Sequence, residues 1–354
     1  MKILRLYTRL PPLSGGMEKH IAELTKEQIN LGHEVTIYFN EGNSVTSNDV
    51  QVSRVPFYKL KPQFLGVFIF YILTCARLVL NNEKFDLVHI HGDWSSLVFS
   101  SLVKKIVGSK RLFMSIHDEL SNNFLSKKAL SMFISKVDIV FSSGYSLASE
   151  LKKLTSVNII IQPSGIQNIF LQDYKRIFNK DSFQVIIASN LVKKKNLGLV
   201  LDIAKELPFL KFIVVGDGPE KKHLIERIKY ETIVNVQLLG YKIPSELLQL
   251  YYESDIFLIT SSREGTPTAM LEAMACGLPI VTSGAGGVKS ILGSHNYITA
   301  SNDKKSFVKC ILDLIKDIDL MSAASKQNIK SSQAYSWPNV AKTINNYINI
   351  SHKL

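Results

Sequence analysis

Residues 261–279 read SSREGTPTAMLEAMACGLP, and this stretch decides the fold more than any other part of the chain. The apolar run DIFLIT at 255–260 leads into it and is typical of a buried strand. A short turn around Gly265 follows, and then an apolar run of helical character. The order strand, tight loop, helix is the repeating unit of parallel α/β sheets.

Two carboxylates, Glu264 and Glu272, stand eight positions apart in this unit. The first falls on the loop and the second about one turn inside the predicted helix. Open α/β sheets bind ligands beyond the carboxyl ends of their strands, and a helix N-terminus there suits phosphate. Strand-loop-helix units are common, however, and the helix dipole alone favours an acid in the first turn. The spacing by itself therefore leaves a purely structural role open.

The same alternation of strands and helices runs along the chain and restarts midway. In the first half we predict strands over 2–7, 34–40, 86–91, 111–116, 138–142 and 158–161, and helices over 17–31 and 94–107. In the second half we predict strands over 183–188, 211–215, 234–239, 256–260 and 279–282, and helices over 197–207 and up to about 230. The end, 334–351, is predicted to be a helical region that is interrupted around Trp337-Pro338. This spacing indicates α/β domains with parallel, doubly wound sheets. Because the apolar periodicity lapses near 163–180, we expect one domain over 1–165 and another over 166–336.

The composition narrows the class of protein. Three cysteines without a Cys-x-x-Cys pair argue against a disulfide framework or a zinc site and fit a reducing compartment. The net charge of +12 suits nucleic acid, a membrane surface or anionic small molecules, but no nucleic-acid motif of the recognised kinds is present. The apolar segment 64–80 carries Arg77 and falls short of about 20 clean apolar residues, so we interpret it as a well-buried helix, with membrane contact as the alternative.

Three loops carry residues suited to ligand chemistry. The two glycines of the Ser-Gly-Gly run at 14–16 let the backbone approach a ligand before a helix begins. His117 ends a strand and can donate to a substrate hydroxyl or stabilise developing charge. The lysines at 193–195 follow a strand and can hold a diphosphate. Each has an ordinary alternative, namely a connecting loop, a structural histidine or a solvated surface.

Two other patterns have weaker implications. His89 and His91 alternate on a strand, and we expect one of them in the core and the other at the ligand edge. The triplet at 317–319, Asp-Ile-Asp, resembles a metal-binding motif but falls within a helical stretch at 307–320, so we interpret it as a surface feature.

Taken in order, these motifs resemble the GT4 family of retaining glycosyltransferases, over nearly the whole chain. The most specific is the Glu264…Glu272 segment with its EAMACGLP ending. The others, in chain order, are SGGMEKH at 14–20, GHEV at 32–35, DLVHIH at 86–91, His117-Asp118, Lys195-Asn196, VGDGP at 215–219, LGY at 239–241 and Gly286-Gly287.

The resemblance implies the GT-B fold, in which two Rossmann-like domains face each other across a cleft. The first domain would bind the acceptor and the second the donor, and the last segment, about 337–354, would pack back on the first domain. The reaction would be transfer of a hexose from a UDP- or GDP-sugar, with no cofactor and no metal. A nucleotide-sugar donor and a glycan or lipid-linked glycan acceptor are the expected partners, and nucleic acid is not.

The resemblance also assigns roles to residues. Glu272 would hold the ribose, Glu264 would lie against the donor sugar, Lys195 would neutralise the diphosphate, and His117 would contact the sugar. The catalytic set would be His117, Glu264 and Lys195. The donor-binding set would be Gly16, Asn190, Lys195, Gly216, Tyr241, Glu264, Gly265, Thr266, Pro267, Thr268, Ala269 and Glu272.

The chain departs from the family pattern at three places. Asn190 stands where many members have an arginine, Pro267 stands where many have a glycine, and Lys289-Ser290 replaces the usual Pro-Glu. The first change removes a fixed positive charge, and the second removes a backbone N–H. Two alternatives to an active transferase therefore stay open: a catalytically weak or silent partner protein, and a sugar-nucleotide epimerase or phosphorylase on the same architecture.

The setting of the reaction is a further expectation. A Lys-, Asn- and Ile-rich composition is typical of bacterial genomes of low GC content, which favours surface polysaccharide or lipid-linked glycan synthesis. The amino terminus enters a strand directly and lacks the features of a signal peptide. We expect a cytoplasmic protein, with peripheral contact at an anionic inner membrane face as an additional expectation.

Overall fold

The computed structural model describes residues 1–13, 16–52, 60–117, 120, 123–172, 174–178, 182–262, 264–294, 296–299 and 301–350. The chain divides into two compact units, unit 1 with residues 1–164 and 340–354, and unit 2 with residues 165–339. The first boundary follows residue 164, one residue before the expected position 165. The second follows residue 339, three residues after the expected position 336.

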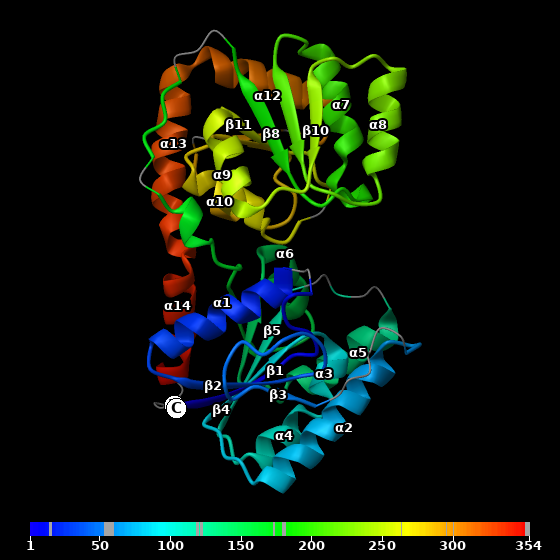
Figure 1. The fold of residues 1–354 in the computed structure, drawn as a ribbon, viewed down its shortest axis with the longest axis vertical. Helices are drawn as coiled ribbons and strands as arrows, with labels where there is room; N and C mark the ends of the chain where they lie inside the picture. The colour runs from blue at the N-terminus through cyan, green and yellow to red at the C-terminus, as the bar shows by residue number, and fades with distance from the viewer. Residues whose placement is uncertain are drawn as a thin grey trace. The chain divides into compact units, whose positions relative to one another are not determined.

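Unit 1 is built on a seven-stranded parallel sheet with the order β3-β2-β1-β4-β5-β6-β7 (Figure 1). Strand order reverses between β1 and β4, the kind of switch point at which open α/β sheets bind ligands. The strands are β1 (Lys2–Leu6), β2 (Glu34–Phe39), β3 (Val50–Gln51), β4 (Leu87–His91), β5 (Arg111–Ile116), β6 (Ile139–Ser142) and β7 (Asn158–Ile161).

Helices cover both faces of this sheet because alternate residues of each strand point to opposite sides. Leu4 and Leu6 of β1 belong to a large apolar core on one face, and Ile37 and Phe39 of β2 pack with Ile21 on the other. The helices are α1 (Gly16–Asn30), α2 (Phe64–Asn81), α3 (Trp94–Leu97), α4 (Ser100–Ile106), α5 (Phe124–Ile134), α6 (Tyr145–Lys152) and α14 (Trp337–Ile350).

Two sequence-based expectations for unit 1 are wrong. The single helix expected at 94–107 is two helices, α3 and α4, because the Ser100 hydroxyl donates to the Leu97 carbonyl at 2.7 Å and competes with a continuous helical ladder. Helix α2 is expected to be well buried, but only 39% of its 18-residue apolar window is buried. By length and composition, this helix could cross a membrane.

Unit 2 contains a six-stranded parallel sheet with the order β10-β9-β8-β11-β12-β13. Its strands are β8 (Gln184–Ala188), β9 (Lys211–Val215), β10 (Val236–Gly240), β11 (Ile256–Ile259), β12 (Ile280–Thr282) and β13 (Tyr297–Ile298). Its helices and 3₁₀ turns are η2 (Asn168–Phe170), η3 (Lys193–Lys195), α7 (Leu197–Glu206), α8 (Lys221–Tyr230), α9 (Pro244–Glu253), α10 (Thr268–Ala275), α11 (Val288–Ile291), α12 (Lys304–Lys316), α13 (Ile318–Ser332) and η4 (Gln333–Tyr335).

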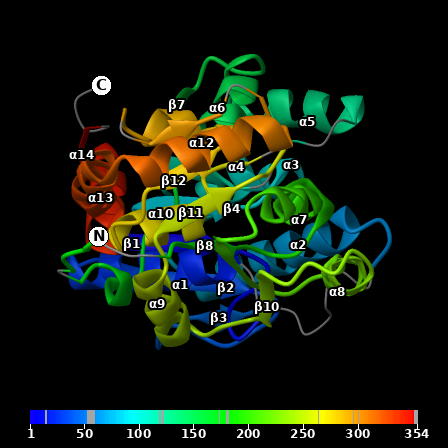
Figure 2. The same ribbon diagram turned by 90° about the horizontal axis from the view of Figure 1, so that it is seen from above.

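The two faces of this sheet also form separate apolar cores. Val185 and Ile187 of β8 pack with α7 and α12, and α12 lies across β12 in Figure 2. Ile186 and Ala188, the alternate residues, pack with α9 and α10 on the opposite face. Both units are therefore Rossmann-like domains with doubly wound parallel sheets, which confirms the predicted fold class.

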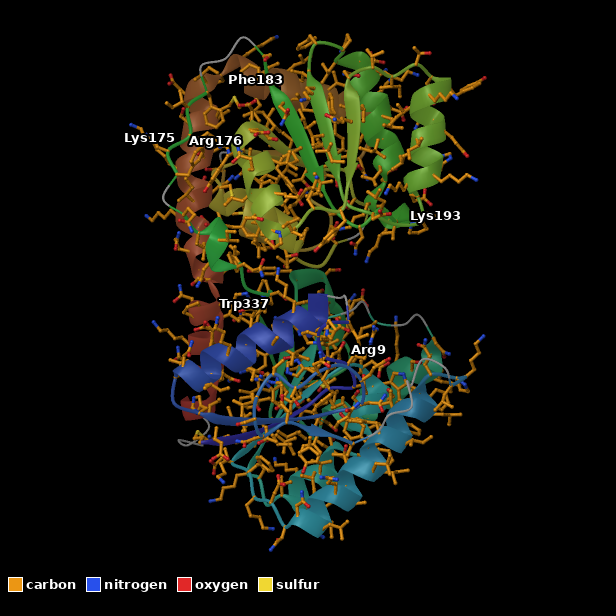
Figure 3. The ribbon with its side chains drawn as sticks, in the orientation of Figure 1. Arg9, Lys175, Arg176, Phe183, Lys193 and Trp337 are labelled. Carbon is orange, nitrogen blue, oxygen red and sulfur yellow. The ribbon has the colours of Figure 1, made fainter. Side chains whose placement is uncertain are left out.

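The beginning of unit 2 is held by the partly buried guanidinium of Arg176, which is labelled in Figure 3. Its Nη2 donates to the carbonyls of Tyr251 at 2.7 Å and Cys276 at 3.0 Å.

The start of α13 is capped by Asp317, which accepts from the Leu320 N–H at 2.8 Å. The helix expected over 307–320 thus ends at Lys316, and the first acid of the Asp-Ile-Asp triplet serves as a helix cap.

Candidate active site

Adjacent strands of unit 2 bring Lys195 and Glu264 together. Lys195 ends η3, shortly after β8, and Glu264 follows β11, which pairs with β8. The Lys195 Nζ donates to Glu264 Oε1 at 2.5 Å, with 16% and 7% of the two side chains exposed. The loops are also linked by their backbones, because the Thr260 hydroxyl donates to the Lys195 carbonyl at 2.9 Å. The predicted cation and the predicted acid are therefore direct partners at the carboxyl edge of the sheet.

Glu272 lies on α10, which begins just after this pair. Pro267 is the N-cap residue of α10, and Thr268 and Ala269 are its first two residues. The first N–H groups of a helix have no partner within the helix, so they are available to an anion. Glu272 is 8% exposed. Burial raises the pKa of neighbouring Tyr251 well above its usual range, and the Glu272 carboxylate adds to this shift.

Two glycines give this edge its shape through close backbone approaches. Gly216, at φ +134°, would place a Cβ atom 1.9 Å from the Ser189 carbonyl oxygen. Gly286, at φ +65°, would place one 1.7 Å from the Glu264 carbonyl oxygen. Gly216 therefore packs against the loop that carries Asn190, and Gly286 fixes the backbone of the Glu264 loop.

The other predicted donor-binding residues differ in exposure. Asn190 and Thr268 are exposed, and Gly265, Thr266, Pro267 and Ala269 are partly buried. Tyr241, just after β10, is 72% exposed. Gly16 begins α1 in unit 1, and a Cβ atom there would have no neighbour within 4 Å among the described residues. Ser14, Gly15 and Asp118 lie outside the described residues.

Space at the Lys195–Glu264 pair is small. A cavity of about 20 Å³ is lined by these two residues together with Pro267, Ser189 and Thr260. This volume accommodates about one water molecule. Any ligand larger than water must therefore lie outside this cavity or separate the pair.

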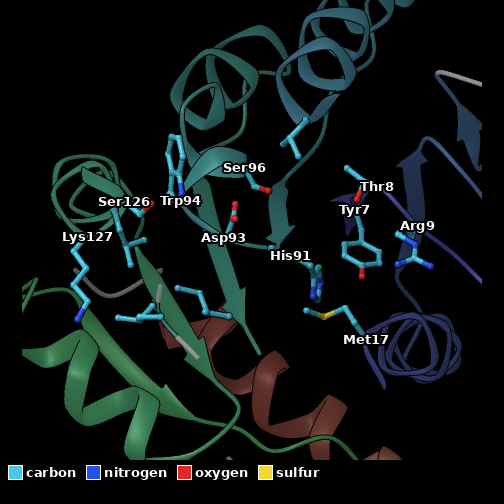
Figure 4. Close-up of a pocket in the computed structure, with 15 residues that line it drawn as sticks. Tyr7, Thr8, Arg9, Met17, His91, Asp93, Trp94, Ser96, Ser126 and Lys127 are labelled. Atoms are coloured by element: carbon cyan, nitrogen blue, oxygen red, sulfur yellow. The ribbon is translucent and has the colours of Figure 1, made fainter. Parts of the chain in front are cut away.

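The carboxyl edge of the unit 1 sheet has a different lining. A cavity of about 390 Å³ opens where β1, β4 and β5 end (Figure 4). Arg9 and Lys127 are basic residues in its lining, and Trp94 and Val67 are apolar ones. The Arg9 Nε lies 3.6 Å from Glu18 Oε1, a buried carboxylate of α1.

Three histidine rings gather beside this cavity, from α1, β4 and the end of β5. The centroid of the His20 ring lies 4.4 Å from that of His117 and 5.9 Å from that of His91. Burial lowers the pKa of His117 to about 4 and holds those of His20 and His91 well below the usual range. All three rings are therefore neutral near pH 7, and His117 can act as a neutral donor or acceptor.

His89 and His91 fit the expectation that one lies in the core and the other at the ligand edge, because His89 is fully buried and His91 lines the cavity. Residues i and i+2 of a strand share one face, and the two rings lie side by side at 4.3 Å. Both are buried, and His89 bonds to the Ser115 hydroxyl at 2.8 Å. The period of two in the sequence could have placed them together. Grouping His20 with them required knowledge of how α1 crosses the sheet.

Two family models match this chain. The description glycosyltransferase family 4 matches residues 14–167, and glycosyl transferases group 1 matches residues 171–331. The gpi3 subunit of phosphatidylinositol N-acetylglucosaminyltransferase from Schizosaccharomyces pombe is 24% identical over 355 residues, covering 94% of this chain and 76% of the relative. N-acetyl-alpha-D-glucosaminyl L-malate synthase of Bacillus anthracis is 25% identical and covers 87% of both.

Solved structures share the fold. Anabaena HepE in complex with UDP has a TM-score of 0.80 and 18% identity, covering 99% of this chain and 100% of that one. Sucrose-phosphate synthase of Thermosynechococcus elongatus has a TM-score of 0.81 and 14% identity, covering 99% of both. Two Rossmann-like units with these neighbours define the GT-B class of fold. The chain belongs to the GT4-type, group 1 glycosyltransferases, as the sequence motifs predict.

Proposed function

We propose that this protein is a retaining, metal-independent hexosyltransferase. It takes a hexose from a UDP- or GDP-sugar and transfers it to an acceptor hydroxyl, in the synthesis of a bacterial surface polysaccharide or lipid-linked glycan. The observation that supports this most strongly is the Lys195–Glu264 pair beside the start of α10, with Glu272 on the same helix. A cation, helix N–H groups and two acids meet the needs of a diphosphate, a sugar and a ribose.

Donor binding changes the partners of Lys195. The ammonium and the Glu264 carboxylate neutralise each other at 2.5 Å. A diphosphate carries more negative charge than one carboxylate, so it competes for the ammonium and frees Glu264 for the hydroxyls of the donor sugar. The amides of Thr268 and Ala269 supply further donors, whereas Pro267 has none to give. Charge on the leaving group is thus stabilised by preorganised groups, without a metal.

Histidine 117 acts in its neutral form. Because burial keeps its pKa near 4, it does not supply a fixed positive charge at pH 7. It contacts the transferred sugar as a hydrogen-bond donor, and the remaining charge stabilisation comes from Lys195 and α10.

UDP is the first nucleotide to test. Structural neighbours in the HepE series were solved with UDP and with UDP-glucose, although likeness at 18% identity supports the fold and not the ligand. The curated relatives named for phosphatidylinositol glycosylation favour an amphiphilic acceptor for this chain as well.

The deciding experiment uses purified protein with UDP- and GDP-sugars and a panel of lipid-linked and soluble acceptors. We expect transfer that EDTA does not reduce, and a product whose anomeric proton, followed by NMR, keeps the donor configuration. An inverted product would refute the retaining mechanism. Nucleotide binding without turnover on any donor would favour the silent partner protein, and conversion of the donor without an acceptor would favour the epimerase.

We also propose that α2 carries the protein to an anionic membrane surface. Leu65, Ile69, Ile72, Leu73, Val79 and Leu80 are all exposed on this helix. Their spacing of three, four and seven residues gives a stripe along one side, where a helix facing only water would carry polar residues. The neighbouring helices α4 and α5 have four lysines, α2 has Arg77, and none of the three contains an acid. An apolar stripe with basic surroundings suits the interface of an anionic bilayer.

Vesicle sedimentation tests this surface independently of catalysis. Wild-type protein is expected to sediment with vesicles containing phosphatidylglycerol and much less with pure phosphatidylcholine. The double variant Ile69→Glu, Ile72→Glu should lose most of this binding. Val234→Glu, at an 86%-exposed apolar position of unit 2, is the matched control and should sediment like wild type. Equal loss in both variants would contradict the proposal.

A further inference from the structure

We propose that His20, His91 and His117 form a binding site for a divalent transition-metal ion, which inhibits the protein when it is occupied. The metal-binding part of this proposal rests only on the three histidine side chains and not on the proposed function. The inhibitory effect rests on the proposed function, because it depends on the contact of His117 with the donor sugar.

The geometry brings three ligand atoms within reach of one ion. One ring nitrogen from each histidine lies within 4.8 Å of the other two. A tetrahedral ion with metal–nitrogen bonds of about 2.0–2.1 Å holds its ligand nitrogens about 3.3 Å apart. Small rotations of the rings toward a common centre are therefore sufficient, without a change in the course of the backbone.

The rings also have unmet hydrogen-bonding capacity. His91 is 1% exposed, and among the residues that the structure describes neither of its ring nitrogens has a hydrogen-bond partner. The His117 Nε2 is likewise buried without a partner in the described part of the chain. Leaving a buried polar group without a hydrogen-bond partner is energetically unfavourable. A metal ion bound through one nitrogen lone pair of each ring removes that cost for the nitrogens that bind it.

Ser164 orients one of the three histidines, and the cavity gives an ion a route to the cluster. The Nδ1 of His20 lies 3.0 Å from the Ser164 hydroxyl, which sets the orientation of the ring. His91 lies in the wall of the 390 Å³ cavity (Figure 4). An ion can therefore reach the cluster from that side, and a water molecule can complete its coordination there.

The donor set selects the kind of ion. Three neutral imidazoles suit Zn²⁺, Co²⁺, Ni²⁺ or Cu²⁺, whereas Mg²⁺ and Mn²⁺ prefer oxygen ligands. Arg5 is buried near these rings, and its charge helps to keep the pKa values of His20 and His91 low. The same charge opposes a bound cation, so we expect weaker affinity than at a site that contains cysteine thiolates.

Direct binding measurements test the site first. Equilibrium dialysis and calorimetry of the full chain with ZnCl₂ should give one ion per chain, and Co²⁺ should give the intense visible absorption of a tetrahedral complex. The His91→Asn variant should lose more than about 100-fold in affinity, since loss of a residue that only orients a ligand already costs 10–100-fold. Ser164→Ala keeps all three ligands and should lose about 10–100-fold.

Controls separate this site from adventitious binding. His223 is exposed on α8, and His223→Ala should leave the stoichiometry at one. Circular dichroism shows whether His91→Asn folds, and Ser164→Ala keeps the test decisive if it does not. No binding to wild type, or binding that survives both site variants, would overturn the metal site.

Inhibition is measured separately. One equivalent of Zn²⁺ should suppress transfer, and EDTA should restore it to the metal-free rate. Zinc that binds with the stated ligand dependence but leaves transfer unchanged would refute the inhibitory role while keeping the site. A chain with no transfer activity at all would refute the proposed function and leave the binding result standing.

Discussion

The carboxyl edges of the two sheets differ in charge and in space. In unit 2, Lys195 and Glu264 are paired at 2.5 Å around a cavity of about 20 Å³. In unit 1, neutral histidines lie beside a cavity of about 390 Å³. The same topology thus supports one edge with a lysine–glutamate pair and another with neutral imidazoles beside a larger cavity of mixed lining.

The proposed function assigns the nucleotide-sugar donor to the charged edge and the acceptor to the larger cavity. A nucleotide diphosphate is an anion of fixed chemistry, so its edge needs charges at defined positions and can be recognised in the sequence. An acceptor varies in shape and polarity, and an open cavity with mixed lining suits it. The substitutions below test that division, beginning with the charged edge.

Lys195→Ala should have the largest effect. Removing one preorganised charge-stabilising donor costs about 10²–10³ in rate, and the variant also leaves Glu264 buried without its partner. We expect kcat for transfer to fall by about this factor, measured by release of the nucleotide. Lys194→Ala, at the exposed neighbouring position, is the control and should stay within about twofold. Similar losses in the two variants would show that the lysines act only as general surface charge.

The two acids should separate turnover from binding. Glu264→Ala should lower kcat by about 10² with a smaller change in nucleotide affinity, because this carboxylate lies against the sugar in the proposed complex. Glu272→Ala should instead weaken nucleotide binding, measured by calorimetry, by about 10-fold or more, because charged hydrogen bonds contribute about 1.5–3 kcal/mol. Parental transfer rates in both variants would make the site assignment wrong.

Gly165→Ala tests a stability contact of unit 2, outside the charged edge. A Cβ atom at position 165 would lie 2.4 Å from the ring of Trp337. Trp337 is 3% exposed and labelled in Figure 3, so the ring has little room to move. Overpacking of this kind costs about 1–3 kcal/mol, and urea unfolding should report a loss in that range. Gly16→Ala, where the added atom meets open space among the described residues, is the control.

Much of this architecture could be predicted because strand periodicity is local. The bounds of β5, β7 and β9 match those expected, since each is a short apolar run between turn residues. The two-residue strands β3 and β13 were not predicted, because they are too short to show a period. The exposure of α2 was not predicted either, since an apolar helix has the same sequence whether protein or lipid covers it.

The site could be predicted only where its residues are close in sequence. Glu264 and Glu272 lie on one loop and helix, so their spacing is visible along the chain. The contact of Lys195 with Glu264 depends on the pairing of β8 with β11. The approach of His20 to His117 depends in the same way on the path of α1, which no local pattern records.

His117→Asn should have a moderate effect at the edge that carries the histidines. A neutral hydrogen-bond donor contributes about 0.5–1.5 kcal/mol, so we expect kcat to fall by about tenfold, less than for Lys195→Ala. Steady-state rates of both variants, measured with one donor, provide the comparison. A larger loss for His117→Asn would mean that this ring carries charge or moves a proton in the reaction, and the division between the two edges would not hold.

Asn190→Arg should have the smallest effect on transfer, and it is the substitution expected to raise kcat/KM. Asn190 is exposed in the loop that packs on Gly216, and many members of the family have an arginine there. A guanidinium offers a bidentate, fully charged contact to a phosphate. Its orientation must be held by surrounding residues, and in this chain those residues surround an asparagine. We therefore expect kcat/KM to rise by only a few-fold, far less than the loss caused by Lys195→Ala. Asn190→Ala is the matched control and should leave the rate nearly unchanged if the asparagine contributes little. An inactive wild type that gains transfer only in Asn190→Arg would identify the native chain as a silent partner protein, whose charged edge binds nucleotide without completing the reaction.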